Sequence, residues 1–154
     1  ANPASFGLWG KLNGAWYRTE EYYYDSRQVG QQKTDAEYVE DLKALLAGRR
    51  PERVIVDPSA ASFIQALRRA GFPVTPADND VADGIRVTAD LLKRRRIILC
   101  RSCRDCLRDT RKDRDAPRKE QDHAMDDLRY FAMDLAGEER GGFAAAWVER
   151  RSAG

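Results

Sequence analysis

The sequence predicts an α/β fold built on a mixed sheet, and three observations support this. A hairpin with an Asn13-Gly14 turn comes first, which requires an antiparallel pair of strands. Helices and short apolar strands then alternate, the order that is typical of a sheet covered by helices. The 154 residues are 42% hydrophobic and 34% charged, which suits one domain with its own core. We therefore expect a single domain over residues 1–154, in which residues 135–154 form a C-terminal tail of unassigned role.

The first part of the chain is expected to form the hairpin and one capped helix. Residues 4–9 and 15–24 are rich in apolar and aromatic side chains, as β-strands are. The polar residues 25–32 are expected to form a loop. Thr34 and Glu37 have the spacing of a capping box, so a helix begins there, and it ends before Gly48.

The rest of the chain is expected to alternate between strands and helices. Extended segments are expected at residues 53–56, 72–76 and 97–100, and helices at 59–70, from Asp80 or Asp83 to 92, at 102–111 and at 122–135. The last of these helices has an apolar stripe of Met125, Leu128, Ala132 and Leu135. Residues 112–121 are a charged loop, and the tail at 138–151 could be helical.

Charge is spread unevenly along this chain, although its formal net charge is only +2. Residues 93–119 hold twelve Lys and Arg against four Asp, which gives this segment +8 and leaves the remainder acidic. Such a segment suits a polyanion contacted along one face. The residues that we expect to contact the DNA backbone are Lys93, Arg94, Arg95, Arg96, Arg101, Arg104, Arg108, Arg118 and Lys119.

Several classes of protein are disfavoured by the composition. No apolar run approaches the length of a membrane span, and the first residues do not resemble a signal peptide. An odd number of closely spaced cysteines favours a reducing compartment, and the absence of a Gly-rich phosphate loop argues against an ATPase site. Cys100, Cys103 and Cys106 have a C-x2-C-x2-C spacing but lack a fourth ligand nearby, so burial explains them better than metal binding.

Carboxylates at two distant positions are the candidates for chemistry. Asp57 follows a short β-branched strand, and ligands gather at the carboxyl ends of strands in open α/β sheets. Asp122, His123 and Asp126 share one flank of the helix at 122–135, within about 100° of arc. Each group also has a simpler explanation, because Asp57 could cap the following helix and Asp122 could cap its own.

Oxygen ligands from two elements beside a basic segment are the ingredients of metal-assisted phosphodiester cleavage. Mg²⁺ and Mn²⁺ prefer oxygen ligands, and two such ions about 4 Å apart can activate a water and stabilise the leaving oxygen. We expect Asp57, Asp126, His123 and Asp122 to bind metal, with Asp57, Asp126 and His123 taking part in catalysis. His123 could ligate the metal or handle protons.

The segment D-H-A-M-D-D-L-R-Y at residues 122–130 resembles the carboxy-terminal nuclease domain of phage terminase large subunits, which typically read N-D-H-A-(M/I)-D-A-L-R-Y there. Further similarity is found in Asn2-Pro3, in Leu8-Trp9-Gly10, in the aromatic segments at 16–17 and 21–25, and at residues 32–38, 56–60, 79–81 and 83–86. The resemblance covers residues 1–131. Asp127 departs from it, because the family has alanine at this position.

The resemblance implies an RNase H-like fold and a Mg²⁺- or Mn²⁺-dependent endonuclease that cuts concatemeric phage DNA during genome packaging. Asp57 matches the second-strand catalytic carboxylate, and Asp126, with His123 and Asp122, matches the late metal-binding helix. Implied partners are double-stranded DNA, the ATPase domain of the same large subunit, the terminase small subunit and the portal or procapsid. The implied location is the cytoplasm of a bacterial host, with a phage or prophage gene.

The family carries another catalytic Asp on a first, central strand that precedes Asn2-Pro3, so we expect that strand to be missing or to lie outside this chain. Activity could then be impaired. Two alternatives remain open: another RNase H-like nuclease, such as a resolvase or an RNA–DNA hybrid nuclease, or a catalytically inactive DNA- or protein-binding module of the packaging motor.

Overall fold

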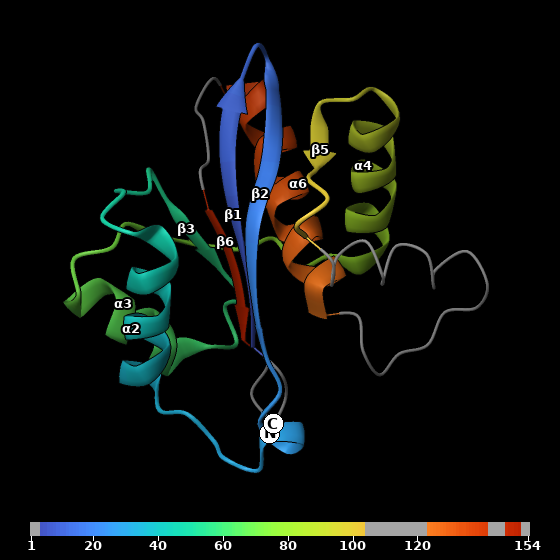
Figure 1. The fold of residues 1–154 in the computed structure, drawn as a ribbon. Coiled ribbons are helices and arrows are strands. Elements are labelled where there is room, and N and C mark those ends of the chain that lie inside the picture. The colour runs from blue at the N-terminus through green and yellow to red at the C-terminus, as the bar shows by residue number, and fades with distance from the viewer. Residues whose placement is uncertain (1–3, 104–122, 142–146, 152–154) are drawn as a thin grey trace.

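A computed structural model describes residues 4–103, 123–141 and 147–151, and it contains one mixed sheet with helices on both faces (Figure 1). In chain order the elements are β1 (Ala4–Leu12), β2 (Ala15–Tyr24), α1 (Ser26–Val29), α2 (Asp35–Leu46), β3 (Val54–Val56), α3 (Ala61–Arg69), β4 (Val74–Pro76), α4 (Val81–Lys93), β5 (Ile97–Leu99), α6 (His123–Gly141) and β6 (Trp147–Arg151). The predicted α/β fold with a mixed sheet is confirmed.

The sheet has the strand order β4-β3-β6-β1-β2-β5. β1 pairs antiparallel with both β2 and β6. The other three pairs are parallel, namely β6–β3, β3–β4 and β2–β5. All strands except β1 therefore run the same way, and their carboxyl ends meet at one edge of the sheet. We call this the carboxyl edge, and the opposite one the amino edge.

Two hydrophobic clusters, one on each face, hold the helices to the sheet. α2 and α3 cover one face through Tyr38, Leu42 and Phe63, which pack with Phe6 and Leu8 of β1. α4 and α6 cover the other face. There the Phe131 ring stacks on that of Trp9 with the centroids 4.0 Å apart. The predicted stripe of α6 is buried throughout.

The local signals of the sequence are found where they were expected. Asn13 and Gly14 both have positive φ, as the two-residue turn of the hairpin requires. Thr34 and Glu37 form the capping box of α2, and the Asp80 side chain caps α4 by accepting from the Asp83 backbone N–H. These short-range devices depend only on neighbouring residues, which is why they can be read from the sequence.

Two segments differ from the expectation. The predicted loop at 25–32 contains the single turn α1, because the Asp25 side chain caps it and Gly30 ends it. The tail is not one helix: α6 continues to Gly141, and β6 pairs with β1 and β3. β6 takes the position beside β3 where we expected a strand from outside the chain. A strand there satisfies the backbone groups that β1 and β3 would otherwise leave unpaired. The helix predicted at 102–111 lies almost entirely outside the described residues.

The far end of α6 is held to the start of β3 by charge. Arg53 pairs with Glu138, and its Nη1 lies 3.6 Å from Oδ2 of Asp134. Burial raises the pKa of Asp134 to about 6, Arg53 opposes the shift, and Glu138 adds to it. α6 therefore runs across β3, with its C-terminal half near the amino edge.

We expect Asp134 to make stability fall as pH rises from about 4 to about 6. Its folded-state pKa lies above the unfolded value, so between these values the folded protein binds more protons, and the difference is on the order of 2 kcal/mol. Urea unfolding of the wild type and Asp134→Asn at several pH values measures this. The free-energy difference between the two should change across that interval, and parallel pH profiles would contradict the prediction.

Candidate functional site

Asp57 lies at the carboxyl edge, directly after β3 (Figure 1). Its side chain is buried, and Oδ1 accepts a hydrogen bond of 2.9 Å from the backbone N–H of Ser59. Its carbonyl oxygen also accepts from the Ala60 N–H at 3.0 Å. Asp57 therefore caps the segment after β3, as the simpler explanation expects, but this cap occupies only one of the two carboxylate oxygens.

The other oxygen of Asp57 connects the strand to α6. The Tyr130 hydroxyl donates to Oδ2 over 2.7 Å, and this hydrogen bond is buried. Burial, and then the hydrogen bond to Asp57, raises the pKa of Tyr130, so the phenol keeps its proton and remains a donor at neutral pH. Each Asp57 oxygen thus accepts one hydrogen bond, which fixes the carboxylate while leaving lone pairs on both atoms.

Asp126 lies one helical turn before Tyr130, on the same side of α6. α6 runs from the carboxyl edge toward the amino edge. Along the helix axis, Asp126 therefore lies about 6 Å further from the amino edge than Tyr130 does. Its side chain is 19% exposed and pairs with Arg129. The Arg129 stem packs on α4 at Gly84, where an added Cβ would lie 3.3 Å from Cδ of Arg129. The fold thus brings the two predicted carboxylates toward the same edge, with Asp57 hydrogen-bonded to Tyr130 and Asp126 paired with Arg129.

Asp127, the next residue, has a different environment and is fully buried. It accepts hydrogen bonds from the Ser5 hydroxyl of β1 and from the guanidinium of Arg18 of β2, which is also fully buried. Burial raises the pKa of Asp127, and Arg18 and Ser5 oppose that shift. Asp127 is therefore partnered by the sheet and points away from the solvent-facing end of the site.

Gly7 makes room for this ion pair. A Cβ on Gly7 would collide with Nη1 of Arg18, so the guanidinium occupies the space above the glycine. Neither Arg18 nor Tyr130 was predicted from the sequence to be part of a site. A signal was present for Arg18, since alternation places it on the same face of β2 as the buried Trp16.

The remaining predicted ligands cannot be compared with the structure. Asp122 lies outside the described residues, and His123 is described only as the first residue of α6. Within the described residues, no group of three or more His, Cys, Asp or Glu side chains is placed to hold a metal ion. Asp57 and Asp126 supply hard oxygen donors, one of them oriented by outer hydrogen bonds, which fits the preference of Mg²⁺ or Mn²⁺.

The predicted DNA contacts separate into three groups. Lys93 to Arg96 come before β5 and lie at the amino edge, opposite Asp57. Arg101 follows β5 and is exposed. Arg104, Arg108, Arg118 and Lys119 lie outside the described residues. The part of the basic segment that the structure describes is therefore divided between the two ends of the sheet.

The cysteines have a structural explanation as far as they are described. Cys103 is buried, with Sγ 3.2 Å from the Arg18 carbonyl oxygen, and burial raises its thiol pKa to about 11. Cys100 and Cys103 are both free thiols. A thiol with a raised pKa is a poor metal ligand. Cys106 lies outside the described residues.

Comparison with solved structures finds large terminases. The large terminase from a thermophilic bacteriophage matches with a TM-score of 0.80 and 42% sequence identity over 88% of this chain and 36% of its own. The same terminase in complex with ADP gives 0.78 and 43%, and in complex with ATP-gamma-S 0.78 and 44%, each over 85% of this chain and 36% of its own. This chain is similar to part of a phage large terminase.

The match extends over about a third of the bacteriophage terminase, so the chain corresponds to one part of that larger protein. No protein-family model and no curated protein matches the chain. Among the described residues, no helix of this terminase-like chain has both the length and the hydropathy of a membrane span.

Proposed function

We propose that this chain is the nuclease part of a phage large terminase, a Mg²⁺- or Mn²⁺-dependent endonuclease that cuts concatemeric DNA during genome packaging. The observation that carries the proposal is Asp57, held at the end of β3 by Tyr130 of the helix that presents Asp126. It occurs in a chain that is 42–44% identical to a large terminase. The chain has no Gly-rich phosphate loop, which favours the nuclease part over an ATPase part.

The side chains have distinct roles in the proposed mechanism. Asp57 and Asp126 would hold the metal ions, and His123 and Asp122 complete the proposed ligand set. When bound, the ions supply Lewis acidity and an activated water for hydrolysis of the phosphodiester bond. Tyr130 and the Ser59 N–H orient Asp57, and the pairing of Asp127 with Arg18 keeps a third negative charge away from the ligands.

The proposed setting follows from the same similarity. Double-stranded DNA is the substrate, and the ATPase domain of the same large subunit, the small subunit and the portal or procapsid are the partners. The protein would act in the cytoplasm of the infected or lysogenic bacterium. Little sequence selectivity is expected, because phosphate contacts do not carry base information.

A plasmid cleavage assay tests the proposal. We expect nicking or linearisation in Mg²⁺ or Mn²⁺, none in EDTA, and none for Asp126→Asn. Glu40→Gln is the matched control, because Glu40 is an exposed acid on α2 and makes an ordinary i,i+3 pair with Lys43. Cleavage that survives Asp126→Asn would contradict the site. Preferential cutting of an RNA–DNA hybrid or a branched junction would instead identify another RNase H-like nuclease.

A second candidate is a DNA- or protein-binding module that does not cut. The observation in its favour is that the described residues hold no cluster of three metal-ligating side chains, and that Asp126 is paired with Arg129. DNA binding without metal-dependent cleavage, and without metal binding in titration calorimetry, would support this candidate over the nuclease.

A further inference from the structure

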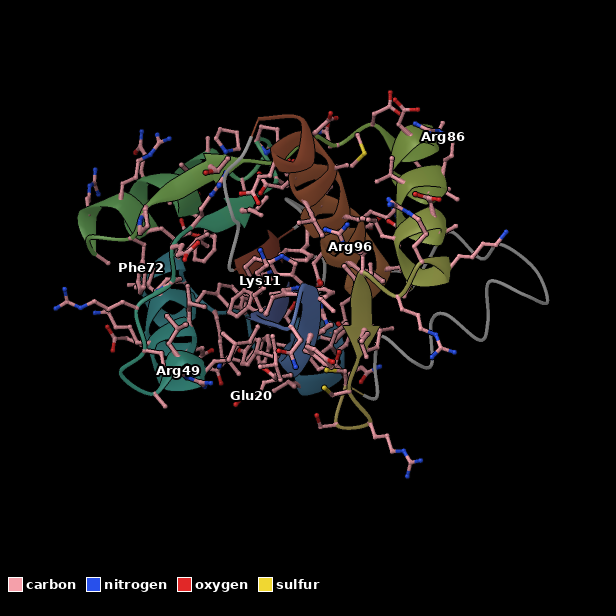
Figure 2. All side chains as sticks on the ribbon, turned by 90° about the horizontal axis from the view of Figure 1, so that it is seen from above. Lys11, Glu20, Arg49, Phe72, Arg86 and Arg96 are labelled. Carbon is pink, nitrogen blue, oxygen red and sulfur yellow. The ribbon has the colours of Figure 1, made fainter. Side chains whose placement is uncertain are left out.

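The amino edge of the sheet carries a concentration of exposed cations that the proposed cleavage site does not use. β1 ends at this edge, next to Lys11, and so do the helices α3 and α4. The segment before β3 also lies at this edge. The exposed cations at this edge are Lys11, Arg49, Arg50, Arg68, Arg69, Lys93, Arg94 and Arg95, and the acids beside them are Glu20, Glu52 and Asp90. Figure 2 looks onto this edge, with Arg49 and Phe72 at one side, Lys11 over the middle and Arg96 toward α4.

The opposite edge has the reverse charge. α2 and α4 begin at the carboxyl edge, and their first turns and caps are acidic. The acids of the described residues at this edge are Asp25, Asp35, Glu37, Asp57, Asp78, Asp80, Asp83 and Asp126, and they outnumber the cations there, Arg27, Lys33, Arg101 and Arg129. A polyanion that approaches the protein is therefore attracted most strongly to the amino edge.

A pocket lies at the β3–β4 side of this cationic edge. It has a volume of about 410 Å³ and is lined by Arg49, Arg50, Pro51, Ala70, Gly71, Phe72 and Pro73. The volume falls within the range of about 300–1,000 Å³ that is usual for small-ligand sites. Two arginines on the wall and a half-buried phenylalanine ring offer a phosphate its counter-charge and a sugar or base an apolar surface.

The arginines of this pocket are available to a ligand to different degrees. Arg49 Nη2 lies 3.2 Å from Glu20 and 3.0 Å from the Leu45 carbonyl oxygen, so it is already held in place. Arg50 and Arg69 are exposed and make no ion pair within the described part of the chain. The pocket thus combines one positioned guanidinium, that of Arg49, with that of Arg50, which can reorient toward a phosphate, and Arg69 lies next to the lining residue Ala70.

We infer that the amino edge, centred on this pocket, is a second binding surface for the phosphate backbone of DNA. The inference rests on the proposed function in taking DNA as the polyanion. The cations extend from the pocket beside β4 and β3 to Lys93 beside β5, five strand spacings away, or roughly 24 Å. A line of charge of that length fits a repeating phosphate backbone better than a single anionic group.

This surface would hold a different stretch of DNA from the one at Asp57. The six residue steps from Pro51 to Asp57 separate the two edges by about 20 Å. A straight duplex that follows the row of cations along the amino edge therefore stays about 20 Å from Asp57. The amino edge therefore binds DNA beside the segment that is cut.

Fluorescence anisotropy with a short labelled duplex in EDTA tests the inference without cleavage. Arg50→Ala/Arg69→Ala should weaken binding about tenfold and lower the slope of log affinity against log salt by between one and two, because each lost phosphate contact lowers it by about 0.9. The matched control is Arg27→Ala/Arg86→Ala, which removes the same charge from two exposed arginines of α1 and α4. It should bind within about twofold of wild type, since these residues do not belong to the cations of the amino edge.

Three results would overturn the inference: unchanged binding by the amino-edge variant, equal weakening by both double variants, or concentration-dependent self-association that the amino-edge variant abolishes. The last would make this edge an interface between copies of the chain. The same variants in the plasmid assay separate the two proposals. Wild-type-like DNA binding by the amino-edge variant with normal cleavage rejects only the second surface. Binding that depends on this edge without any metal-dependent cleavage rejects only the nuclease.

Discussion

Asp127→Ala is expected to lower the free energy of unfolding by about 3 kcal/mol, the lower end of the usual cost of breaking a buried ion pair, because Glu21 remains beside Arg18. Arg18 is fully buried, and its guanidinium pairs closely with Asp127 and more loosely with Glu21, whose Oε2 lies 3.4 Å from Nη2. Gly7, against which it lies, offers no polar side chain to replace the lost carboxylate. Alanine is also the residue that the terminase family typically has at this position, so the destabilisation would be specific to a chain that carries Arg18.

Urea unfolding of Asp127→Ala, Arg18→Met and the double variant measures this coupling. Replacing both members of a buried pair by apolar groups is often close to neutral, so the double variant should be more stable than Asp127→Ala alone. If the two single changes simply add, Asp127 and Arg18 stabilise the fold independently, and the ion pair does not have the importance given to it here.

Asp57→Asn is expected to reduce metal-dependent DNA cleavage by about 10²–10³-fold, or about 2.7–4 kcal/mol of transition-state stabilisation, while the fold remains stable. Asparagine has the same shape, and its amide oxygen can still accept from the Ser59 N–H. The Tyr130 hydroxyl can rotate to accept from the new amide group. The negative charge that attracts a divalent cation is lost, so the effect should fall on catalysis and metal affinity.

Tyr130→Phe is the graded companion of this variant. It removes the hydrogen bond to Oδ2 of Asp57 but keeps the charge and nearly all of the packing. It should raise the Mn²⁺ concentration needed for half-maximal cleavage about tenfold, as loss of an outer hydrogen bond to a ligand usually does. Wild-type cleavage by Asp57→Asn would remove Asp57 from the site. An unaltered metal requirement in Tyr130→Phe would mean that Tyr130 is only a packing residue.

Asp126 and Asp127 are neighbours on one turn of α6, and we expect one to affect activity and the other stability. Asp127 faces the sheet and serves the fold, whereas Asp126 faces the end of β3 and is proposed to serve the reaction. Adjacent helix residues point about 100° apart, which is enough for one to be buried and the other to reach the edge. Swapping their roles would require α6 to rotate against Trp9 of β1, on which the Phe131 ring is stacked.

Local sequence signals predicted much of the fold and the position of Asp57. The Asn13-Gly14 turn, the Thr34–Glu37 capping box and the Asp80 cap involve residues at most three positions apart. Their physical causes are short-range, so neighbouring residues suffice to read them. The strand at 54–56 was likewise identified by its continuous apolar character, and Asp57 by its place at the end of that strand.

The sequence by itself determined the class of fold, the two candidate carboxylates and the chemistry they suit. Only the tertiary structure decided that Tyr130 of α6 bonds Asp57, that Asp127 pairs with Arg18 at a separation of 109 residues, and that Lys93 to Arg96 lie opposite Asp57. The reason is that strand direction and pairing are set by long-range contacts, which bring together side chains with no relation along the chain. Asp122 to Tyr130 reads as one acidic helix start, but the sheet beneath it buries Asp127 in the fold and leaves Asp126 as the candidate ligand.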